Sequence, residues 1–326
     1  MKTGKLPPIL FKEILDLIKG SAEGVEVPPL YGVDAGAFKI GDKYIVVAQD
    51  PITFTSSDII WYSVYVNAND VAVLGAKPEY FLLTLLLPEN ILEDEIKELF
   101  KRLNEVCNQL GVKILGGHTE VTYGIDRVIV NGTMIGITDK IITSQDAKPG
   151  DYLVMIKGIP IEAISIVARE KEQELLRYLP PKEIKRLKNF NYNPGISIVR
   201  EALVLKDYVN AMHDITEGGL MGAVFEMANS SNVKIIIEKE DVKVYPEAKV
   251  LEYFDIDPYF AIGSGSLIAS VSEDNLDNLL KRCKKERIDI SIIGQITEGS
   301  GVWVKEGNKI SKLEWEGQDS IVKLFE

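Results

Sequence analysis

Polar residues interrupt an apolar segment in the sequence NANDVAVLGAKP, residues 67–78. Asn67 and Asp70 are three residues apart, so on a helix they share one side of its last turns. Such a pair can hold a divalent cation or a sugar phosphate if a loop from another strand faces it. It can also be no more than the hydrogen-bonded end of a helix, and the pair taken alone favours that interpretation.

Further acidic or polar groups recur at the expected ends of strands and helices in the first half of the chain. They are Asp34 in GVDAG, Asp50 in AQDP and the segment GGHTE at residues 116–120. Carboxylates that gather at one edge of a sheet repel each other unless a cation offsets their charge. Mg²⁺ prefers oxygen ligands and commonly bridges to nucleotide phosphates, and a diglycine lets backbone N–H groups approach an anion. Each signal is weak alone, because an Asp before proline and a Gly-Gly pair are often only turn residues.

The elements that position these residues follow from hydrophobic patterning. The apolar segment that ends in Asn67 and Asp70 predicts a buried helix from about residue 58 to residue 74, capped by Ser57 or Asp58. The remaining elements expected in the first half are helix 9–19, strand 44–49, strand 80–87, helix 91–110 and a strand pair at 127–130 and 133–138. Together they predict an α+β domain with a mostly antiparallel sheet.

A polar segment with a Pro-Gly pair, residues 144–151, is the best domain boundary and divides the chain into 1–147 and 148–326. Beyond it the loop AMHDITEGGL, residues 211–220, opens a helix at 219–229. The other elements expected there are strand 152–156, helices within 161–190 broken at Pro180–Pro181, helix 196–206, strands 233–238 and 266–272, helix 274–285 and strand 289–294. They predict a second α/β domain.

Composition limits the function classes. A net charge of -12 argues against non-specific binding to nucleic acids or anionic membranes. Cys107 and Cys283 belong to no CxxC pair, which indicates buried free thiols in a reducing compartment. The first residues lack the apolar core of a signal peptide, and no apolar run is long enough to span a bilayer. We therefore expect a cytoplasmic protein, and the abundance of Ile, Lys and Glu suggests a thermophilic source.

Seven motifs, taken in order, resemble the signatures of the aminoimidazole ribonucleotide (AIR) synthetase superfamily. They are GVDAG, AQDPITF, NANDVAVLGAKP, LLLP, GGHTEVT, AKPGD and HDITEGGL. The superfamily includes thiamine-monophosphate kinase, selenophosphate synthetase and the hydrogenase maturation dehydratase, and the chain is most similar to the hydrogenase expression/formation (HypE-like) group. The resemblance implies two α/β domains, with the N-terminal sheets of two subunits pairing into a barrel in a homodimer. It also implies ATP in a long cleft, with Mg²⁺ between acidic loops and phosphates.

The resemblance carries roles to matching positions. It implies Asp50, Asp70 and His118 as catalytic residues. The metal ligands that it implies are Asp34, Asp50, Asp70 and Glu120. The cofactor-binding residues that it implies are Asn67, Asn69, Gly116, Gly117, Thr119, Asp214, Thr216, Gly218 and Gly219, with Glu217 as a further ligand.

The chain also departs from the superfamily pattern. His118 stands where many members carry Asp or Glu, and since neutral imidazole is a poor Mg²⁺ ligand, Glu120 is the alternative source of charge. His213 is equally well explained as a structural residue. Well-known maturation dehydratases end in a cysteine-bearing tail, whereas this sequence ends QDSIVKLFE, and Lys5 is the one cation near the start that is placed to reach a phosphate.

The leading hypothesis is an ATP- and Mg²⁺-dependent enzyme that phosphorylates an oxygen of a small-molecule substrate. Positioning and cation stabilisation carry such chemistry, which suits a site of Asp, Gly and Thr. One alternative is a binding module that keeps the nucleotide pocket and acts as an assembly or maturation partner of another protein. The other is a small-molecule phosphate kinase that resembles thiamine-monophosphate kinase.

Overall fold

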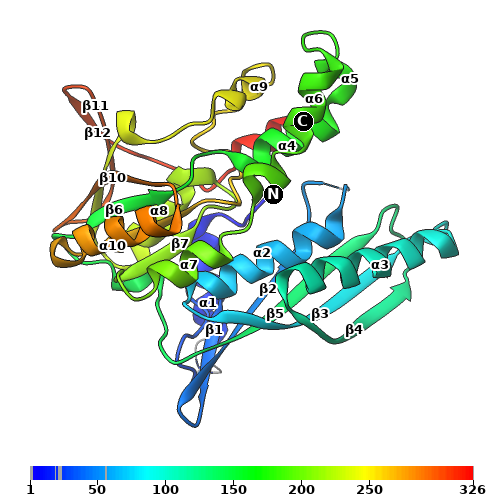
Figure 1. Ribbon diagram of the computed structural model, residues 1–326, viewed down its shortest axis with the longest axis horizontal. Helices are drawn as coiled ribbons and strands as arrows, with labels where there is room; N and C mark the ends of the chain where they lie inside the picture. Colours follow the sequence, from blue (N-terminus) through cyan, green and yellow to red (C-terminus); the bar gives the residue numbers. More distant parts are fainter. Residues whose placement is uncertain (1–2, 19, 21–23, 56, 326) are drawn as a thin grey trace.

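The computed structural model describes residues 3–18, 20, 24–55 and 57–325, and it contains two β-sheets from separate parts of the chain (Figure 1). The first sheet and its helices use the first 138 residues. Their bounds are α1 Pro8–Ile18, β1 Gly36–Ile40, β2 Lys43–Pro51, α2 Ile59–Val73, β3 Lys77–Leu87, α3 Glu93–Leu110, β4 Lys113–Val121 and β5 Ile129–Thr138.

The first sheet has the order β1-β2-β5-β3-β4, and only its β3–β4 pair is parallel. The prediction of a mostly antiparallel sheet is therefore confirmed. Helices α2 and α3 lie on the same side of this sheet (Figure 1). Thirteen residues of α2 are buried, because the helix packs against β2 and β5 on one side and against the second half of the chain on the other.

The second sheet has seven strands in the order β12-β11-β8-β10-β6-β9-β7, of which only β8 and β11 pair in parallel. It adopts a mixed arrangement, so both halves of the chain are α/β domains with mixed sheets. The bounds of its strands and longer helices are β6 Tyr152–Ile156, α4 Ile161–Glu170, α6 Pro181–Lys188, α7 Val199–Leu205, β7 Ala211–Asp214, α8 Gly219–Ser230, β8 Lys234–Glu238, β9 Leu267–Val271, α10 Glu273–Glu286, β10 Ile290–Thr297, β11 Gly301–Glu306 and β12 Lys309–Lys312. The domain division between residues 147 and 148 stays a prediction.

Three local expectations are wrong. Residues 129–138 form one strand, because Asn131 and Gly132 pair with β2 and with β3 at the same time. Asp58 does not cap α2 with its side chain; instead its carboxylate accepts hydrogen bonds from Arg102 at 2.9 and 2.7 Å. The third error concerns strands outside the expected set: residues 113–121 extend through GGHTE as β4, and residues 211–214, 301–306 and 309–312 are strands as well.

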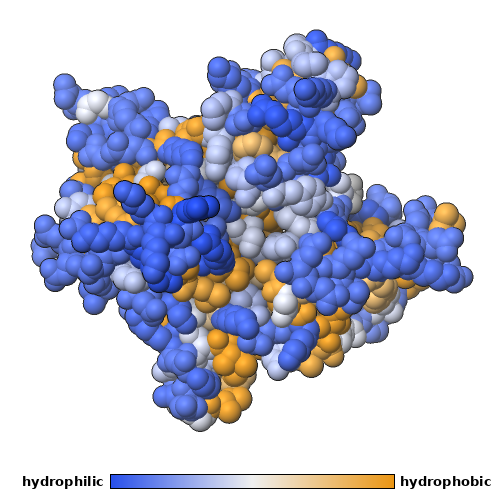
Figure 2. Space-filling view, viewed as in Figure 1, coloured by the Kyte–Doolittle hydropathy of each residue, from blue (hydrophilic) through white to orange (hydrophobic). Residues whose placement is uncertain are grey.

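One strand edge and one sheet face carry exposed apolar residues. All nine residues of β4 are exposed, and β4 is the last strand of its sheet. Orange, apolar atoms gather along the lower side of the molecule, over the region of β1 to β4 (Figure 2). The exposed large side chains of these edge strands are Phe38, Ile40, Ile114, Leu115 and Val121. None of the helices within the described residues combines the length and apolar character needed to cross a bilayer.

Candidate active site between the two domains

A cavity of about 730 Å³ lies between the two domains. From the first domain it is lined by Asp34, Asp50 and Asp70; from the second, Thr216 and Glu226 contribute. Three of the acidic residues that the sequence singled out are thus brought together, although they are up to 36 residues apart in the chain. A cavity of this size is typical of small-molecule and cofactor sites.

Each aspartate comes from a different element. Asp34 precedes β1, Asp50 lies at the end of β2, Asp70 lies near the C-terminal end of α2 and Asp214 is the last residue of β7. Asn67 fixes α2 against β2, because its amide oxygen accepts from the backbone N–H of Asp50 at 2.8 Å and its amide nitrogen donates to the Asp50 carbonyl at 3.2 Å. The packing of α2 on the sheet therefore sets the spacing of Asp50 and Asp70.

Asn69 has a different role in the structure. Its amide nitrogen donates to the carbonyl of Ile196 at 2.8 Å, and its amide oxygen accepts from the backbone N–H of Ile198 at 3.0 Å. Both bonds are buried and join α2 to the second domain. Asn67 and Asn69 are absent from the cavity lining, so in this structure both amides position neighbouring backbone.

The carboxylates of Asp70 and Asp214 lack a full set of hydrogen-bond partners. Among the described residues, Oδ2 of Asp70 and both side-chain oxygens of Asp214 are buried without a hydrogen bond. Burial and the neighbouring carboxylates Asp50 and Asp214 raise the pKa of Asp70 well above its usual range, and burial and Asp34 do the same for Asp214. Buried acids without donors fit a cation that supplies the missing charge.

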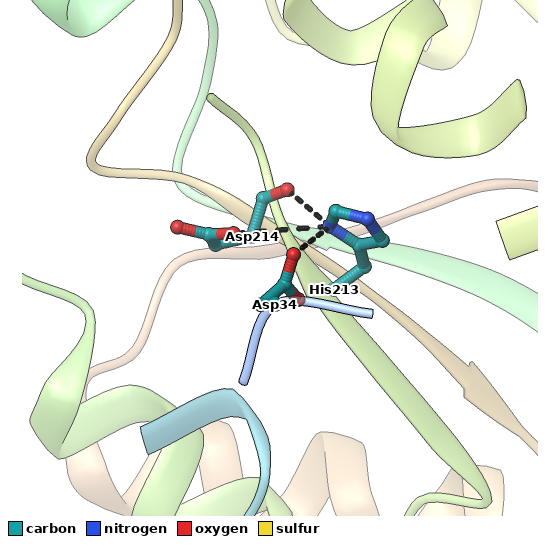
Figure 3. A group of neighbouring side chains, drawn as sticks. All are labelled: Asp34, His213 and Asp214. Carbon is teal, nitrogen blue, oxygen red and sulfur yellow. Dashed lines mark hydrogen bonds and ion pairs between the residues drawn. The ribbon is translucent and has the colours of Figure 1, made fainter. Parts of the chain in front are cut away.

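His213 lies at the centre of a second part of this cluster (Figure 3). Its Nδ1 is 3.4 Å from Asp34 Oδ1 and 3.8 Å from Asp214 Oδ1, and it approaches the Asp214 carbonyl at 2.7 Å. Its Nε2 is 3.1 Å from Glu226 Oε2. One ligand atom from each of Asp34, His213 and Asp214 lies within 4.8 Å of the others, so these residues form a candidate metal-binding group.

Without a metal ion, the surroundings of His213 favour its protonated form. Burial alone lowers its pKa, but the carboxylates of Asp34 and Glu226 outweigh burial and raise the pKa to about 9. His213 in turn keeps Asp34 from a larger rise, although burial still raises the pKa of Asp34 to about 6. The imidazolium thus offsets two of the buried acids from within the protein.

We expect His213→Gln to destabilise the metal-free protein at neutral pH. A pKa raised from 6.5 to about 9 contributes stability that is complete below pH 6.5 and is lost as the pH rises through 9. The difference in unfolding free energy between wild type and variant should be about 2–3 kcal/mol near pH 7 and fall towards zero near pH 10. Urea denaturation with EDTA at both pH values measures it, and a difference independent of pH would contradict the charged state of His213.

Lys5 supplies a second cation, whose side chain is 43% exposed. Its Nζ is 3.6 Å from Glu226 Oε1, and its backbone N–H donates to Glu217 Oε1 at 2.6 Å. Desolvation lowers the pKa of Lys5, yet Glu226, Glu217 and Asp34 together raise it above its usual range. The segment before α1 therefore reaches across the cavity, with its ammonium group among the carboxylates.

The loop after β7 combines cavity and structural contacts. Thr216 lines the cavity, and its carbonyl accepts from the backbone N–H of Gly219 at 3.0 Å. The Gly218 N–H donates to Asp319 at 2.6 Å. The backbone of Gly218 and Gly219 has positive φ where α8 begins, so this tight turn places Thr216 and Glu217 at the cavity.

Five residues expected at the site lie elsewhere in the described chain. Gly116, Gly117, His118, Thr119 and Glu120 belong to the exposed strand β4 and do not line the cavity. His118 and Glu120 contact each other at 3.1 Å, and the hydrogen bond from His118 lowers the pKa of Glu120. The expected loop is a strand because residues 116–121 pair along β3 without a break. Their binding role stays a prediction.

The sequence reasoning missed Glu162, Glu226 and Asp319, which are all buried. A signal was present for the first two, since each is an isolated acid in an apolar helix: Glu162 in IPIEAISIV and Glu226 in GLMGAVFEMA. A carboxylate at a buried helical position needs a partner. Asp319 lies in a polar segment that gives no such signal.

Comparison with known proteins supports these assignments of fold. The family described as AIR synthase related protein, N-terminal domain, matches residues 32–138. The family described as AIR synthase related protein, C-terminal domain, matches residues 148–305. Thiamine-monophosphate kinase of Pyrococcus horikoshii is 29% identical over 86% of this chain and 88% of its own. A putative hydrogenase expression/formation protein of Methanocaldococcus jannaschii is 28% identical over 83% of this chain and 82% of its own. The solved structure described as AaThiL complexed with AMPPCP and TMP has a TM-score of 0.76, at 21% identity over 97% of this chain and 99% of that one.

Proposed function

The chain belongs to the AIR synthase related proteins, and on this premise we propose that it transfers the γ-phosphoryl group of ATP to a small molecule. ATP would bind with Mg²⁺ in the cavity between the domains. The bond between the γ-phosphorus and its bridging oxygen breaks, a bond to an acceptor oxygen forms, and ADP leaves. In this proposal residues 1–147 form the nucleotide, metal and dimerisation domain, and residues 148–326 form the second wall of the site.

The observation that carries the proposal is a set of unpartnered carboxylate oxygens at the cavity and directly beside it. Within the described structure Asp70, which lines the cavity, presents one such oxygen, and Asp214, which is buried and not part of the lining, presents two. Asp34 and Asp50 lie beside them. Oxygen-only donors of this kind fit Mg²⁺, which when bound neutralises phosphate charge during transfer. The four aspartates would hold the ion, Lys5 would contact phosphate, and the loop at Thr216 would orient the nucleotide.

The cysteines support an oxygen acceptor on a small molecule rather than thiol chemistry on this chain. Burial raises the pKa of both Cys107 and Cys283 to about 11, which leaves them poor nucleophiles at neutral pH. Thiamine monophosphate is the first acceptor to test, because one relative is named thiamine-monophosphate kinase and the AaThiL structure is described as a complex with AMPPCP and TMP. The non-catalytic alternative, a nucleotide-binding maturation partner, predicts binding without turnover.

Calorimetric titration with AMPPCP, with and without Mg²⁺, tests nucleotide binding first. We expect binding that requires Mg²⁺, because the carboxylates repel free nucleotide. ADP release from ATP is then measured with and without thiamine monophosphate. Absence of nucleotide binding under both conditions would contradict the proposal, whereas Mg²⁺-dependent binding without any turnover would favour the maturation partner.

We further propose that the protein is a homodimer that pairs through the first sheet. An exposed edge strand with apolar side chains is a site where another strand or sheet docks, and β4 offers Ile114, Leu115 and Val121. A second copy of this chain presents the same apolar edge strand and can pair with it. Pairing of two such sheets would close a barrel and place residues 116–120 at the interface.

We expect Leu115→Lys to convert the dimer to a monomer. The lysine places a charge on each copy at the proposed interface, where like charges repel. Light scattering after size exclusion measures the mass. The matched control is Leu92→Lys, which changes an equally exposed leucine at the start of α3. A monomeric wild type, or loss of the dimer in both variants, would contradict the assignment of β4.

A further inference from the structure

Glu162 is a buried acid on a wall of the cavity away from the aspartates. It lies in the first turn of α4, is 4% exposed and lines the cavity with Ser264 and Ile166. Its neighbours along the chain are apolar: all of residues 159–161 and 163–164 are buried, and each is an Ile, Pro or Ala. A carboxylate in such a run does not contribute to apolar packing.

The carboxylate of Glu162 has an incomplete set of partners. Its Oε2 is buried and has no hydrogen bond among the described residues. Ser264 bonds to the carboxyl group through its hydroxyl and its backbone N–H. A purely structural role would satisfy both oxygens, as nearly all buried polar atoms in folded proteins are satisfied. The open position is therefore available to a donor that enters the cavity.

No cation of the described chain offsets this acid. Burial raises the pKa of Glu162 to about 7, and the neighbouring charge that acts on it is Glu217, which raises it further. Lys5 is engaged by Glu226 and Glu217. A proton neutralises this acid in the empty cavity, and a ligand that brings positive charge or N–H donors would stabilise its ionised form.

Aromatic and aliphatic side chains elsewhere in the cavity lining limit the shape of such a ligand. Phe54 and Ile262 line the same cavity as Glu162, and Trp315 lines it beside the loop at Gly218. An apolar or aromatic body with a nitrogen-bearing group satisfies both the walls and the carboxylate, as in other pockets that combine apolar walls with a few polar groups.

We propose that Glu162 is a specificity-determining residue, which accepts a hydrogen bond from an amine, amidine or protonated ring nitrogen of the phosphoryl acceptor. The inference rests on the proposed function, because it names the chemical class of the acceptor for the same cavity. Glu162 acts in binding and takes no part in phosphoryl transfer.

Benzamidine is the probe, because it joins an aromatic ring to a cationic amidine, and benzamide is its neutral counterpart. Both are titrated into wild type, Glu162→Gln and Glu170→Gln, each with and without Mg²⁺ and AMPPCP. Glu170 is the matched control: it lies on the same helix, is exposed and accepts a hydrogen bond from the Thr55 hydroxyl at 3.0 Å. Thermal unfolding checks that each variant folds.

We expect wild type to prefer benzamidine to benzamide, and Glu162→Gln to weaken benzamidine binding by on the order of 10- to 100-fold. Glu170→Gln should change it by less than about twofold, since an exposed charge contributes little. Unchanged benzamidine affinity in Glu162→Gln, or an equal loss in Glu170→Gln, would overturn the assignment. The nucleotide titration tests the proposed function separately. If wild type does not bind AMPPCP, the proposed function is overturned. The effect of Glu162→Gln on benzamidine affinity without nucleotide then still tests the binding role of Glu162.

Discussion

Asp70→Asn is expected to reduce the affinity for Mg²⁺ and AMPPCP by about 100-fold while making the metal-free protein more stable. The loss lies at the upper end of the 10- to 100-fold effect of residues that only support a metal ligand, because Asp70 offers an unpartnered oxygen directly to the cavity. Calorimetric titration with AMPPCP and Mg²⁺ measures the affinity.

The gain in stability has the opposite physical origin. The pKa of Asp70 is raised by burial and by Asp50 and Asp214, so the stability of the wild type falls as the pH rises through that pKa. Asparagine is never ionised, so the variant should be more stable than the wild type near pH 8 when no metal is bound.

The control for Asp70→Asn is Asp139→Asn, which neutralises an exposed carboxylate of the same domain that pairs with Lys43. It should leave both nucleotide affinity and metal-free stability nearly unchanged. If Asp70→Asn binds nucleotide like the wild type, or if it is destabilised with EDTA present, the cavity does not hold the proposed metal at Asp70.

The second large effect is expected for Gly219→Ala. Gly219 has φ +64, and a Cβ there would lie 2.6 Å from the Tyr259 carbonyl oxygen and 2.8 Å from that of Ala261. The left-handed backbone costs roughly 1–2 kcal/mol for alanine, and forcing backbone apart in a packed region adds roughly 1–3 kcal/mol. We therefore expect a loss of about 3 kcal/mol in the free energy of unfolding, measured with urea.

Gly41→Ala separates the two contributions. Gly41 has φ +61, but no atom lies within 4 Å of a Cβ at that position. This variant should lose only the backbone contribution, about 1 kcal/mol. Equal losses in the two variants would show that residues 259 and 261 yield to the new methyl group. Weaker AMPPCP binding in Gly219→Ala alone would connect the turn to the site.

Local patterns predicted the elements that carry the aspartates. The buried helix over residues 59–73, the strand before Asp50 and the turn after residue 214 all follow from short-range signals: apolar spacing, β-branched runs and glycine. The structure places Asp34, Asp50 and Asp70 around one cavity, an arrangement the motif order suggested through its resemblance to a family.

Long-range pairing explains what the sequence did not show. Asn131-Gly132 is a common turn dipeptide, yet it continues β5 because strands on both sides supply hydrogen-bond partners. The GGHTE segment extends β4 for the same reason, since β3 lies along it. In both cases tertiary contacts override local preference.

The acids Glu162 and Glu226 show a different limit. Their positions in apolar helices indicated that each needed a partner, but the partners come from distant parts of the chain. Glu226 meets His213 and Lys5, whereas Glu162 meets Ser264. Periodicity identifies that such a residue is buried, and only the folded structure identifies what it faces.

Asn69 has a consequence for how the cavity opens. Its two buried hydrogen bonds to residues 196 and 198 tie α2, which forms part of the first domain, to the second domain. A hinge motion between the domains would break both bonds and leave buried polar groups unpaired, at a cost of about 1–3 kcal/mol for each group. We therefore expect the two domains to keep their relative positions when a ligand enters. Entry would then depend on the short segments at the rim of the cavity, above all residues 3–8. There Lys5 would have to move before a metal-bound nucleotide could reach the carboxylates.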